Sequence, residues 1–133
     1  MPHCAVLLPP FVDFTLSGES LIRNERSDPL FTLRGVTALR SLYSPPEHFL
    51  DPALSPLFGD FAGLPPLLFQ ASGSEMLLDD STRAAARAHA AGVKVRFEIW
   101  DGLPHVFQAL PLPPAGRANR NIVEFIQQEC GWS

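Results

Sequence analysis

The sequence predicts an α/β fold built on a parallel sheet of about three strands with flanking helices. The first observation is the apolar run at residues 66–71, which has the composition of a strand buried on both faces of a sheet. The second is an alanine-rich helical segment at about 81–91, whose start the polar residues 79–82 can cap. The third is the alternation of apolar and polar side chains from Val93 to Trp100, a pattern typical of a half-covered or edge strand.

Four further segments complete the predicted order of elements. Residues 4–8 form a short apolar run that ends at two prolines, as a first strand would. Residues 33–43 carry an apolar stripe at helical spacing that can cover a pocket, and residues 117–128 are predicted to form a terminal helix. Residues 51–66 are rich in proline, glycine and aspartate and are predicted to form a loop. The apolar residues of the first helix are Leu33, Val36, Leu39, Leu42 and Tyr43. Those of the second, which are predicted to share one face, are Ile122, Val123, Phe125 and Ile126.

Length and composition restrict the classes of function. A chain of 133 residues fits one domain at most, and its net charge of −4 with no run of lysine or arginine makes nucleic acid an unexpected partner. No stretch is long and apolar enough for a membrane span, and the first residues lack the pattern of a signal peptide, so a cytoplasmic location is expected. Cys4 and Cys130 have no metal-binding spacing and are expected to be free thiols. No metal-binding motif occurs, so we expect no metal.

An acid and a histidine follow the two best-defined strands. Glu75 comes just after the run at 66–71, and His105 comes just after the strand that ends at Trp100, 30 residues beyond Glu75. In open α/β sheets, ligands bind at the carboxyl ends of the strands. A carboxylate and a histidine on adjacent strand ends are two of the three groups of a charge-oriented catalytic triad. The sequence therefore predicts a catalytic site at this edge of the sheet.

These segments resemble the C-terminal part of an α/β-hydrolase of the hormone-sensitive-lipase-like esterase family. The resemblance runs from about Ala5 to Phe125, and it rests on residues 64–81 and 87–108 with shorter matches at 14–20, 28–32 and 51–66. It implies that the N-terminal strands of the complete fold are missing from this sequence. It also implies that about residues 15–60 of this partial domain (1–133) form a cap-proximal or loop insertion between strands.

The resemblance implies hydrolysis of small-acyl esters through a Ser–Glu–His triad without a cofactor. Glu75 falls where these esterases place their catalytic acid, which is usually an aspartate, and His105 falls at the catalytic histidine. In the family, a serine in a GDSAG-type elbow and an HGGG-type oxyanion loop precede this region. Neither motif is present in these 133 residues.

Each assignment has an alternative. Glu75 is otherwise a solvated carboxylate near a helix start, and His105 is otherwise a histidine satisfied in a loop beside Pro104. Asp79 and Asp80 compete for the role of the acid, but their place at the start of a helix favours capping. We therefore favour Glu75.

No serine of this chain fits the missing nucleophile. Ser20 has Gly18 two residues before it but no glycine two residues after it, and Ser74 lies beside the acid itself. Five apolar residues can line an acyl pocket, although such residues are more often plain core. They are Phe11, Phe14, Leu30, Phe31 and Phe107.

Two hypotheses about function follow. The first is that the chain is the C-terminal portion of a serine carboxylic-ester hydrolase, to which it contributes Glu75 and His105, and that it is inactive alone. The second is that it is an inactive remnant that acts as an interaction or oligomerisation module. Such a module could pair through an exposed sheet edge or form a homodimer through the strand from Val93 to Trp100, which the resembled family often uses in dimers.

Overall fold

A three-stranded parallel sheet is the frame of the fold, which we describe from a computed structural model of residues 1–132. The strands lie in the order β1 (Ala5–Leu7), β2 (Leu67–Ser72) and β3 (Val95–Trp100). The helices are α1 (Ser20–Arg23), α2 (Leu33–Tyr43), α3 (Leu78–Ala90) and α4 (Pro113–Cys130), with single 3-10 turns η1 (Pro46–His48), η2 (Pro56–Phe58) and η3 (Phe107–Ala109). The predicted α/β class with a parallel sheet and flanking helices is confirmed.

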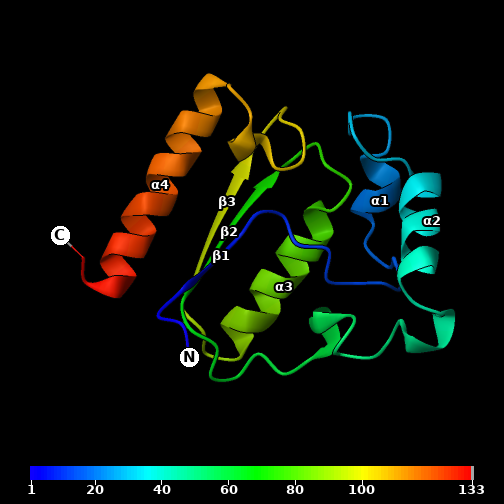
Figure 1. The fold of residues 1–133 in the computed structure, drawn as a ribbon, viewed down its shortest axis with the longest axis horizontal. Coiled ribbons are helices and arrows are strands. Elements are labelled where there is room, and N and C mark those ends of the chain that lie inside the picture. The colour runs from blue at the N-terminus through cyan, green and yellow to red at the C-terminus, as the bar shows by residue number, and fades with distance from the viewer. Residues whose placement is uncertain (133) are drawn as a thin grey trace.

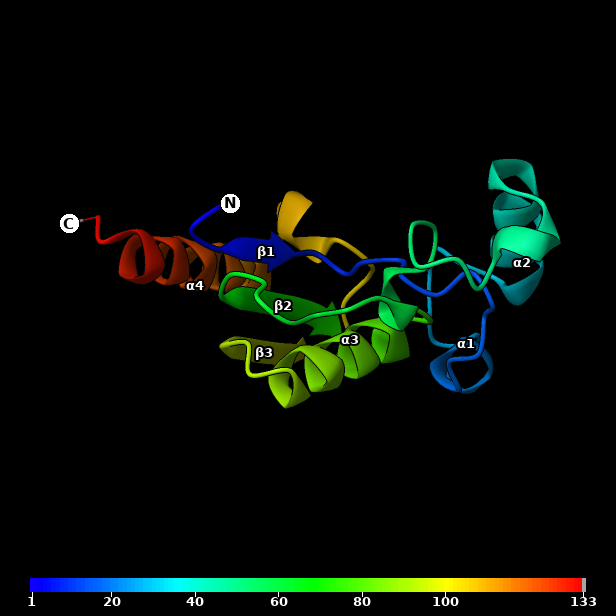
Figure 2. The same ribbon diagram turned by 90° about the horizontal axis from the view of Figure 1, so that it is seen from below.

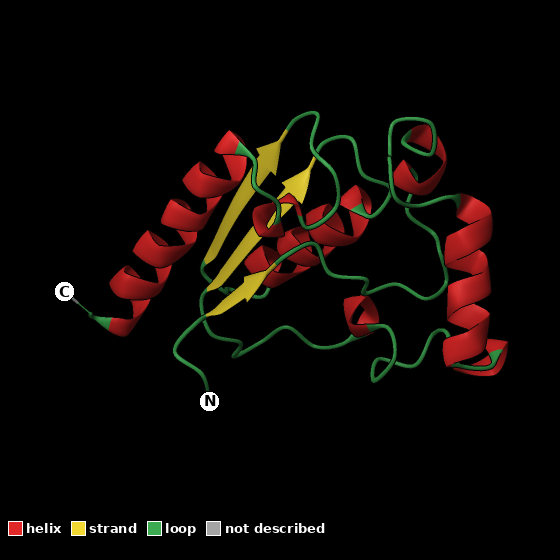
Figure 3. Cartoon of the chain, turned by 45° about the horizontal axis from the view of Figure 1, so that its top comes forward, coloured by secondary structure: helices red, strands yellow, loops and turns green. Residues whose placement is uncertain are grey.

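The central strand β2 is buried along its whole length, and its two faces pack against different helices. Phe69 points into an apolar cluster with Ala84 and Ala88 of α3. Gln70 points to the other face, where its side chain donates to the carbonyl of Ala118 in α4. Figures 1 and 3 show the result: α3 and α4 lie on opposite sides of the sheet.

The strand edges and the long connection from β1 to β2 complete the arrangement. Within residues 1–132, β1 and β3 each pair on one side only, and the residues of β3 are half-buried or exposed, as predicted for an edge strand. The connection from β1 to β2 carries α1 and α2, which lie beyond α3 on the side away from α4 (Figures 1 and 2). No helix in the described part of the chain combines the length and apolar character that crossing a membrane would need.

Helix α3 begins three residues before the predicted start, at Leu78, and this changes the role of the two aspartates. Its N-cap is Leu77, which makes no side-chain cap. The predicted capping role of Asp79 and Asp80 is therefore wrong: both lie inside the first turn. Their carboxylates instead accept backbone N–H groups from the β1–α1 connection, Asp79 from Ser20 (2.8 Å) and Asp80 from Val12 (2.9 Å). They join a distant segment to α3.

The two other long helices agree with the prediction in position but only partly in packing. Helix α2 has the predicted bounds and buries Val36, whereas Leu42 at its far end is 87% exposed. Helix α4 extends beyond the predicted range at both ends and buries Ala118 and Phe125. The prediction that its apolar residues share one face is wrong for Val123, which is 52% exposed while Phe125 is buried. It lies two residues from Phe125, which turns it about 200° around the helix.

A buried cluster of acids joins α3 to the β1–α1 connection. Arg83 binds Asp13 at 2.8 Å and Asp80 at 3.3 Å. Burial raises the pKa of Asp80 to about 6 and outweighs its hydrogen bonds and the nearby Arg83. Burial also acts on Asp13, but hydrogen bonds from Ser17, Thr15 and Arg83 outweigh it and lower the pKa of that carboxyl.

Both cysteines, at the two ends of the chain, are free thiols as predicted.

We predict that the free energy of unfolding falls as the pH rises from about 4 to about 6. The folded chain holds the Asp80 proton more tightly than the unfolded chain, so ionisation in this window costs the folded state stability. At about 1.4 kcal/mol for each pKa unit, the loss is at most about 3 kcal/mol. Asp13 acts in the opposite sense and only below about pH 4.

Urea unfolding at a fixed protein concentration between pH 4 and 6 measures this slope. Asp80→Asn should flatten it, whereas Asp51→Asn, at an exposed loop carboxylate, should leave it unchanged. An equal slope in the unsubstituted chain and in Asp80→Asn would show that Asp80 does not titrate here.

Candidate active site

Glu75 lies in a tight turn just beyond the end of β2, and its side chain is fully buried. One carboxylate oxygen, Oε2, accepts the backbone N–H of Ser72 at 2.8 Å. The other, Oε1, lies 2.9 Å from Nδ1 of His105. The alternative of a solvated loop carboxylate is wrong, because the exposed fraction of Glu75 is 0%. Burial of a carboxylate is costly unless its oxygens are paired, and both oxygens are paired here.

His105 lies in the loop that follows β3, and its ring is held from two sides. An ionised carboxylate can only accept hydrogen bonds, so we assign the ring proton to Nδ1, which donates to Glu75. The ring of Phe31 contacts the imidazole edge-on, with the two centroids 5.0 Å apart. Among residues 1–132, no hydrogen-bond partner is found for Nε2. In the neutral ring Nε2 is therefore a free acceptor.

The two loops that carry Glu75 and His105 are joined to each other. β2 and β3 are in parallel register up to their last residues, where Ser72 pairs with Trp100. The backbone N–H of Gly73 then donates to the carbonyl of Trp100 at 3.1 Å, and the N–H of Gly102 donates to Oγ of Ser74 at 3.2 Å. The acid and the histidine are thus brought together by the strand register and not by their side chains alone.

A third segment supports the loop that carries Glu75, and the sequence analysis did not predict this contact. The side-chain amide of Asn24, just after α1, donates to the carbonyls of Gly73 (3.0 Å) and Glu75 (2.9 Å). The carboxylate of Asp28 accepts the N–H of Met76 at 2.7 Å. Asn24 and Asp28 are each only 8% exposed. Asn24 and Asp28 belong to no periodic pattern of apolar residues, and isolated polar contacts leave no pattern in a sequence.

An apolar cavity of about 260 Å³ opens beside His105. Phe11 and Phe31 line it, as do Val36 and Leu39 of α2, so α2 covers a pocket. Of the other residues expected at an acyl pocket, Phe14 lines a neighbouring cavity of about 370 Å³. Leu30 is 62% exposed, and Phe107 packs in a separate cluster with Ala115 and Ala118.

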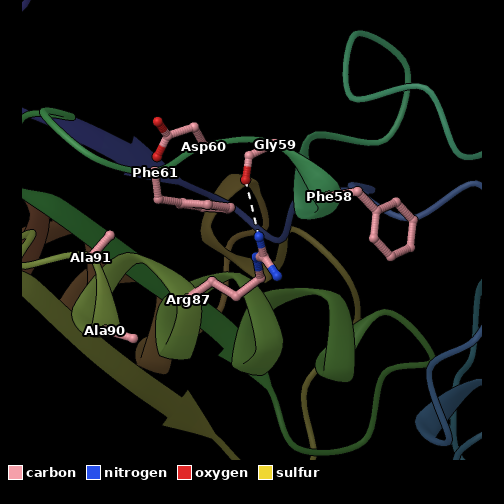
Figure 4. Close-up of a pocket in the computed structure, with 7 residues that line it drawn as sticks. All are labelled: Phe58, Gly59, Asp60, Phe61, Arg87, Ala90 and Ala91. Atoms are coloured by element: carbon pink, nitrogen blue, oxygen red, sulfur yellow. Dashed lines mark hydrogen bonds between the residues drawn. The ribbon is translucent and has the colours of Figure 1, made fainter.

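A larger cavity, of about 590 Å³, lies elsewhere and does not serve this chemistry (Figure 4). It is a shallow depression between the loop after η2 and the C-terminal end of α3. Because α3 rises 1.5 Å per residue, this end is about 20 Å from the start of the helix beside Glu75. Figure 4 shows Arg87 reaching across it to the carbonyl of Gly59, at 3.1 Å, so its cation serves packing of the loop.

The competing acids and the candidate serines have other partners. Asp79 binds Ser20 and Asp80 binds Val12, and within residues 1–132 neither carboxylate bonds to His105. Ser20 donates its hydroxyl to the carbonyl of Met76 at 2.6 Å. The described residues also contain no group of three histidine, cysteine or carboxylate side chains placed to hold a metal ion.

Comparisons with known proteins identify the family of the chain. A family model described as alpha/beta hydrolase fold matches residues 1–109. An esterase of Acinetobacter venetianus is 38% identical over 94% of this chain, and the esterase LipU of Mycobacterium tuberculosis is 33% identical over 98%. A crystal structure of an esterase from the bacterial hormone-sensitive lipase family superposes with a TM-score of 0.92 at 40% identity, over 97% of this chain. The chain spans less than half of each: 42%, 46% and 44% of their lengths.

We predict that Gly73→Ala displaces the side chain of Asp101 and leaves the two loops joined. A Cβ at this position would lie 2.5 Å from Oδ1 of Asp101, and this exposed carboxylate can rotate away. Surface changes of this kind usually alter stability by no more than about 0.5 kcal/mol. The measurements are the unfolding free energy and the NMR signal of the His105 Nδ1 proton, and the signal should be retained.

The matched control is Gly116→Ala in α4, where the nearest atom to a new Cβ is Nη1 of Arg120 at 3.9 Å. That change should be neutral or should stabilise the chain by roughly 0.5–1 kcal/mol, since alanine has a higher helix propensity than glycine. A loss of the His105 signal in Gly73→Ala but not in Gly116→Ala would contradict this prediction.

Proposed function

The chain belongs to the α/β-hydrolase fold family, among esterases and lipases like the hormone-sensitive lipase, and we propose that it supplies the acid and the base of a carboxylic-ester hydrolase. Glu75 is the acid and His105 is the base of a Ser–Glu–His triad. The observation that carries the proposal is the 2.9 Å hydrogen bond from Nδ1 of His105 to the buried carboxylate of Glu75. It leaves Nε2 as the free acceptor on the ring.

Each group has one role in the proposed reaction. Nε2 of His105 takes the proton of a serine hydroxyl as the serine attacks the ester carbonyl, and later gives that proton to the leaving alcohol. Glu75 holds the ring in this tautomer and stabilises the imidazolium that forms in between. The serine elbow and the oxyanion-hole donors are not among the 133 residues, so the reaction needs groups from outside this sequence.

The cavity beside His105 supports small apolar ester groups as substrates. Its volume of about 260 Å³ lies just below the usual range for ligand pockets, about 300–1,000 Å³. Phe11, Phe31 and Leu39 line it with apolar surface. A short alkyl or acyl group beside the reacting carbonyl fits this lining, whereas a charged group would be desolvated without a partner.

A hybrid enzyme tests the proposed roles. This chain would replace the matching segment of the Acinetobacter venetianus esterase, and hydrolysis of p-nitrophenyl acetate would be measured. We predict that the hybrid is active and that Glu75→Gln and His105→Ala each lower kcat by about 10⁴-fold or more, as in other triads. The chain alone should hydrolyse no more ester than its own His105→Ala variant.

The matched control is Asp79→Asn, which removes a nearby carboxylate that bonds to Ser20 and not to His105. It should change kcat of the hybrid by less than about tenfold. A loss equal to that of Glu75→Gln would identify Asp79 as the acid. Unchanged activity in His105→Ala would overturn the proposal.

The open edge of β3 favours a second candidate function, an interaction module. Within residues 1–132 this strand pairs only with β2, and Ile99 on it is 52% exposed. An unpaired strand with exposed apolar side chains is a template for pairing with another chain. A second copy could add its own β3 at this edge and form a homodimer through residues 93–100.

We predict that Ile99→Lys weakens self-association of the chain, because a lysine on an edge strand opposes pairing. Sedimentation velocity at several protein concentrations measures the association. Val123→Lys is the control, since Val123 is equally exposed, at 52%, but lies on α4. Equal association of both variants would place any interface away from β3.

A further inference from the structure

Two buried side-chain amides join the turn that follows His105 to the centre of the sheet. Gln70 lies in β2 and is 0% exposed, and Gln108 lies in η3 and is 7% exposed. Nε2 of Gln108 donates to Oε1 of Gln70 at 3.1 Å. This contact links two segments that are 38 residues apart in the sequence.

The orientation of the Gln70 amide is fixed by its other contacts. Its Nε2 donates to the carboxylate of Glu98 at 2.8 Å and to the carbonyl of Ala118 at 2.9 Å. Both of those atoms can only accept, so the amide cannot be flipped. Oε1 of Gln70 must therefore face η3, and only the NH₂ end of Gln108 can meet it.

The rest of η3 is anchored by separate contacts. The carbonyl of Gln108 accepts the side-chain amide of Asn119 in α4, at 3.1 Å. Phe107 is fully buried against Ala115 and Ala118 of the same helix. The residues that follow His105 are thus held to both β2 and α4.

The residue between His105 and this anchor has a strained backbone. Val106 has φ 52° and ψ 40°, in the left-handed region that β-branched residues rarely adopt. The turn around it is closed by the N–H of Phe107, which donates to the carbonyl of Pro104 at 3.2 Å. Strained residues persist only where their surroundings hold them. If Val106 relaxed, the adjoining His105 would change direction.

The amide pair also carries a cost that packing alone does not explain. Oε1 of Gln108 is buried and has no hydrogen-bond partner in the described part of the chain. Two apolar side chains of similar size would fill the same space without leaving an unpaired acceptor. An unsatisfied buried group of this kind calls for a reason in the mechanism or in the strain of the site.

We propose that Gln108, held by Gln70, is a positioning residue for His105. The amide pair keeps the turn at Val106 in its strained form, and this form directs Nδ1 of His105 to Glu75. The inference rests on the proposed function in one respect: His105 needs to be positioned because it is the proposed base. The positioning itself is a property of this chain and can be measured without catalysis.

The experiment is an NMR measurement on the chain itself, with ¹⁵N-labelled histidine, of the Nδ1 proton of His105. Gln108→Met should abolish or strongly broaden this signal in a protein that still unfolds cooperatively. Gln127→Met, at an exposed position of α4, should leave the signal unchanged. An unchanged signal in Gln108→Met would overturn the proposal.

A second substitution separates positioning from packing. Asparagine tolerates the left-handed backbone better than valine, so Val106→Asn should make the turn less dependent on the amide pair. The signal should return in Val106→Asn/Gln108→Met. If the His105 signal is lost equally in Gln108→Met and in Val106→Asn/Gln108→Met, Gln108 acts through packing only. That result would overturn the proposal.

A third variant covers the case in which Gln108→Met does not fold. Gln70→Met/Gln108→Met removes both amides of the pair. The carboxylate of Glu98 loses its bond to Gln70 but keeps the donors of Trp100 and Asn121, so the chain should fold. Loss of the His105 signal in this variant supports positioning, and retention overturns it. None of these outcomes depends on turnover by the hybrid enzyme, so a failure of the proposed ester hydrolysis would be recognised separately.

Discussion

The structure of the site depends on the parallel register of β2 and β3. Both strands end on the same rung, where Ser72 pairs with Trp100. The chain leaves both strands at one edge of the sheet, and the hydrogen bond from Gly73 to Trp100 extends the ladder into the loops. A shift of two residues in this register would move the two loop exits apart by about 6–7 Å. The 2.9 Å contact between Glu75 and His105 would then be lost.

Glu75 and His105 lie in different environments on the two sides of this hydrogen bond. The carboxylate has no access to water and is compensated by the N–H of Ser72 and by the imidazole. The side chain of His105 is 18% exposed, and His105 lines the apolar cavity. The carboxylate of Glu75 is thus shielded from water and fixed, whereas the imidazole of His105 can exchange protons with solvent or with a substrate. The same division of environments separates the acid from the base in catalytic triads.

The sequence predicted those parts of the fold that have a period, and it did not predict those that depend on single polar contacts. The stripe from Leu33 to Tyr43 and the alternation up to Trp100 mark elements that the structure contains. The order of strand, helix and strand then placed Glu75 and His105 at one sheet edge. Val123 was misplaced because a cluster of adjacent apolar residues does not define one face of a helix.

The contacts of the polar residues could not be predicted for a different reason. Asn24 and Asp28 are buried by long-range bonds to residues 73–76, which no local pattern records. Asp79 looked like a cap because capping is the commonest local use of an aspartate before a helix. Its actual partner, Ser20, lies 59 residues away. Tertiary contacts of this length are decided by the whole fold.

The arrangement of the site helps to choose between the two candidate functions. A chain that only binds a partner through a strand edge gains nothing from a fully buried carboxylate, a strained valine or an unpaired amide oxygen. Comparable costs occur elsewhere in residues 1–132, at Leu16 with φ 58° and at the unpaired hydroxyl of Ser81, so a cost alone does not mark a functional site. The distinguishing feature of this region is that Val106 and Gln108 follow His105 directly, and that the ring of His105 binds a fully buried carboxylate. An interaction through a strand edge uses none of this arrangement. The arrangement therefore favours the acid and base of an ester hydrolase over a simple interaction surface.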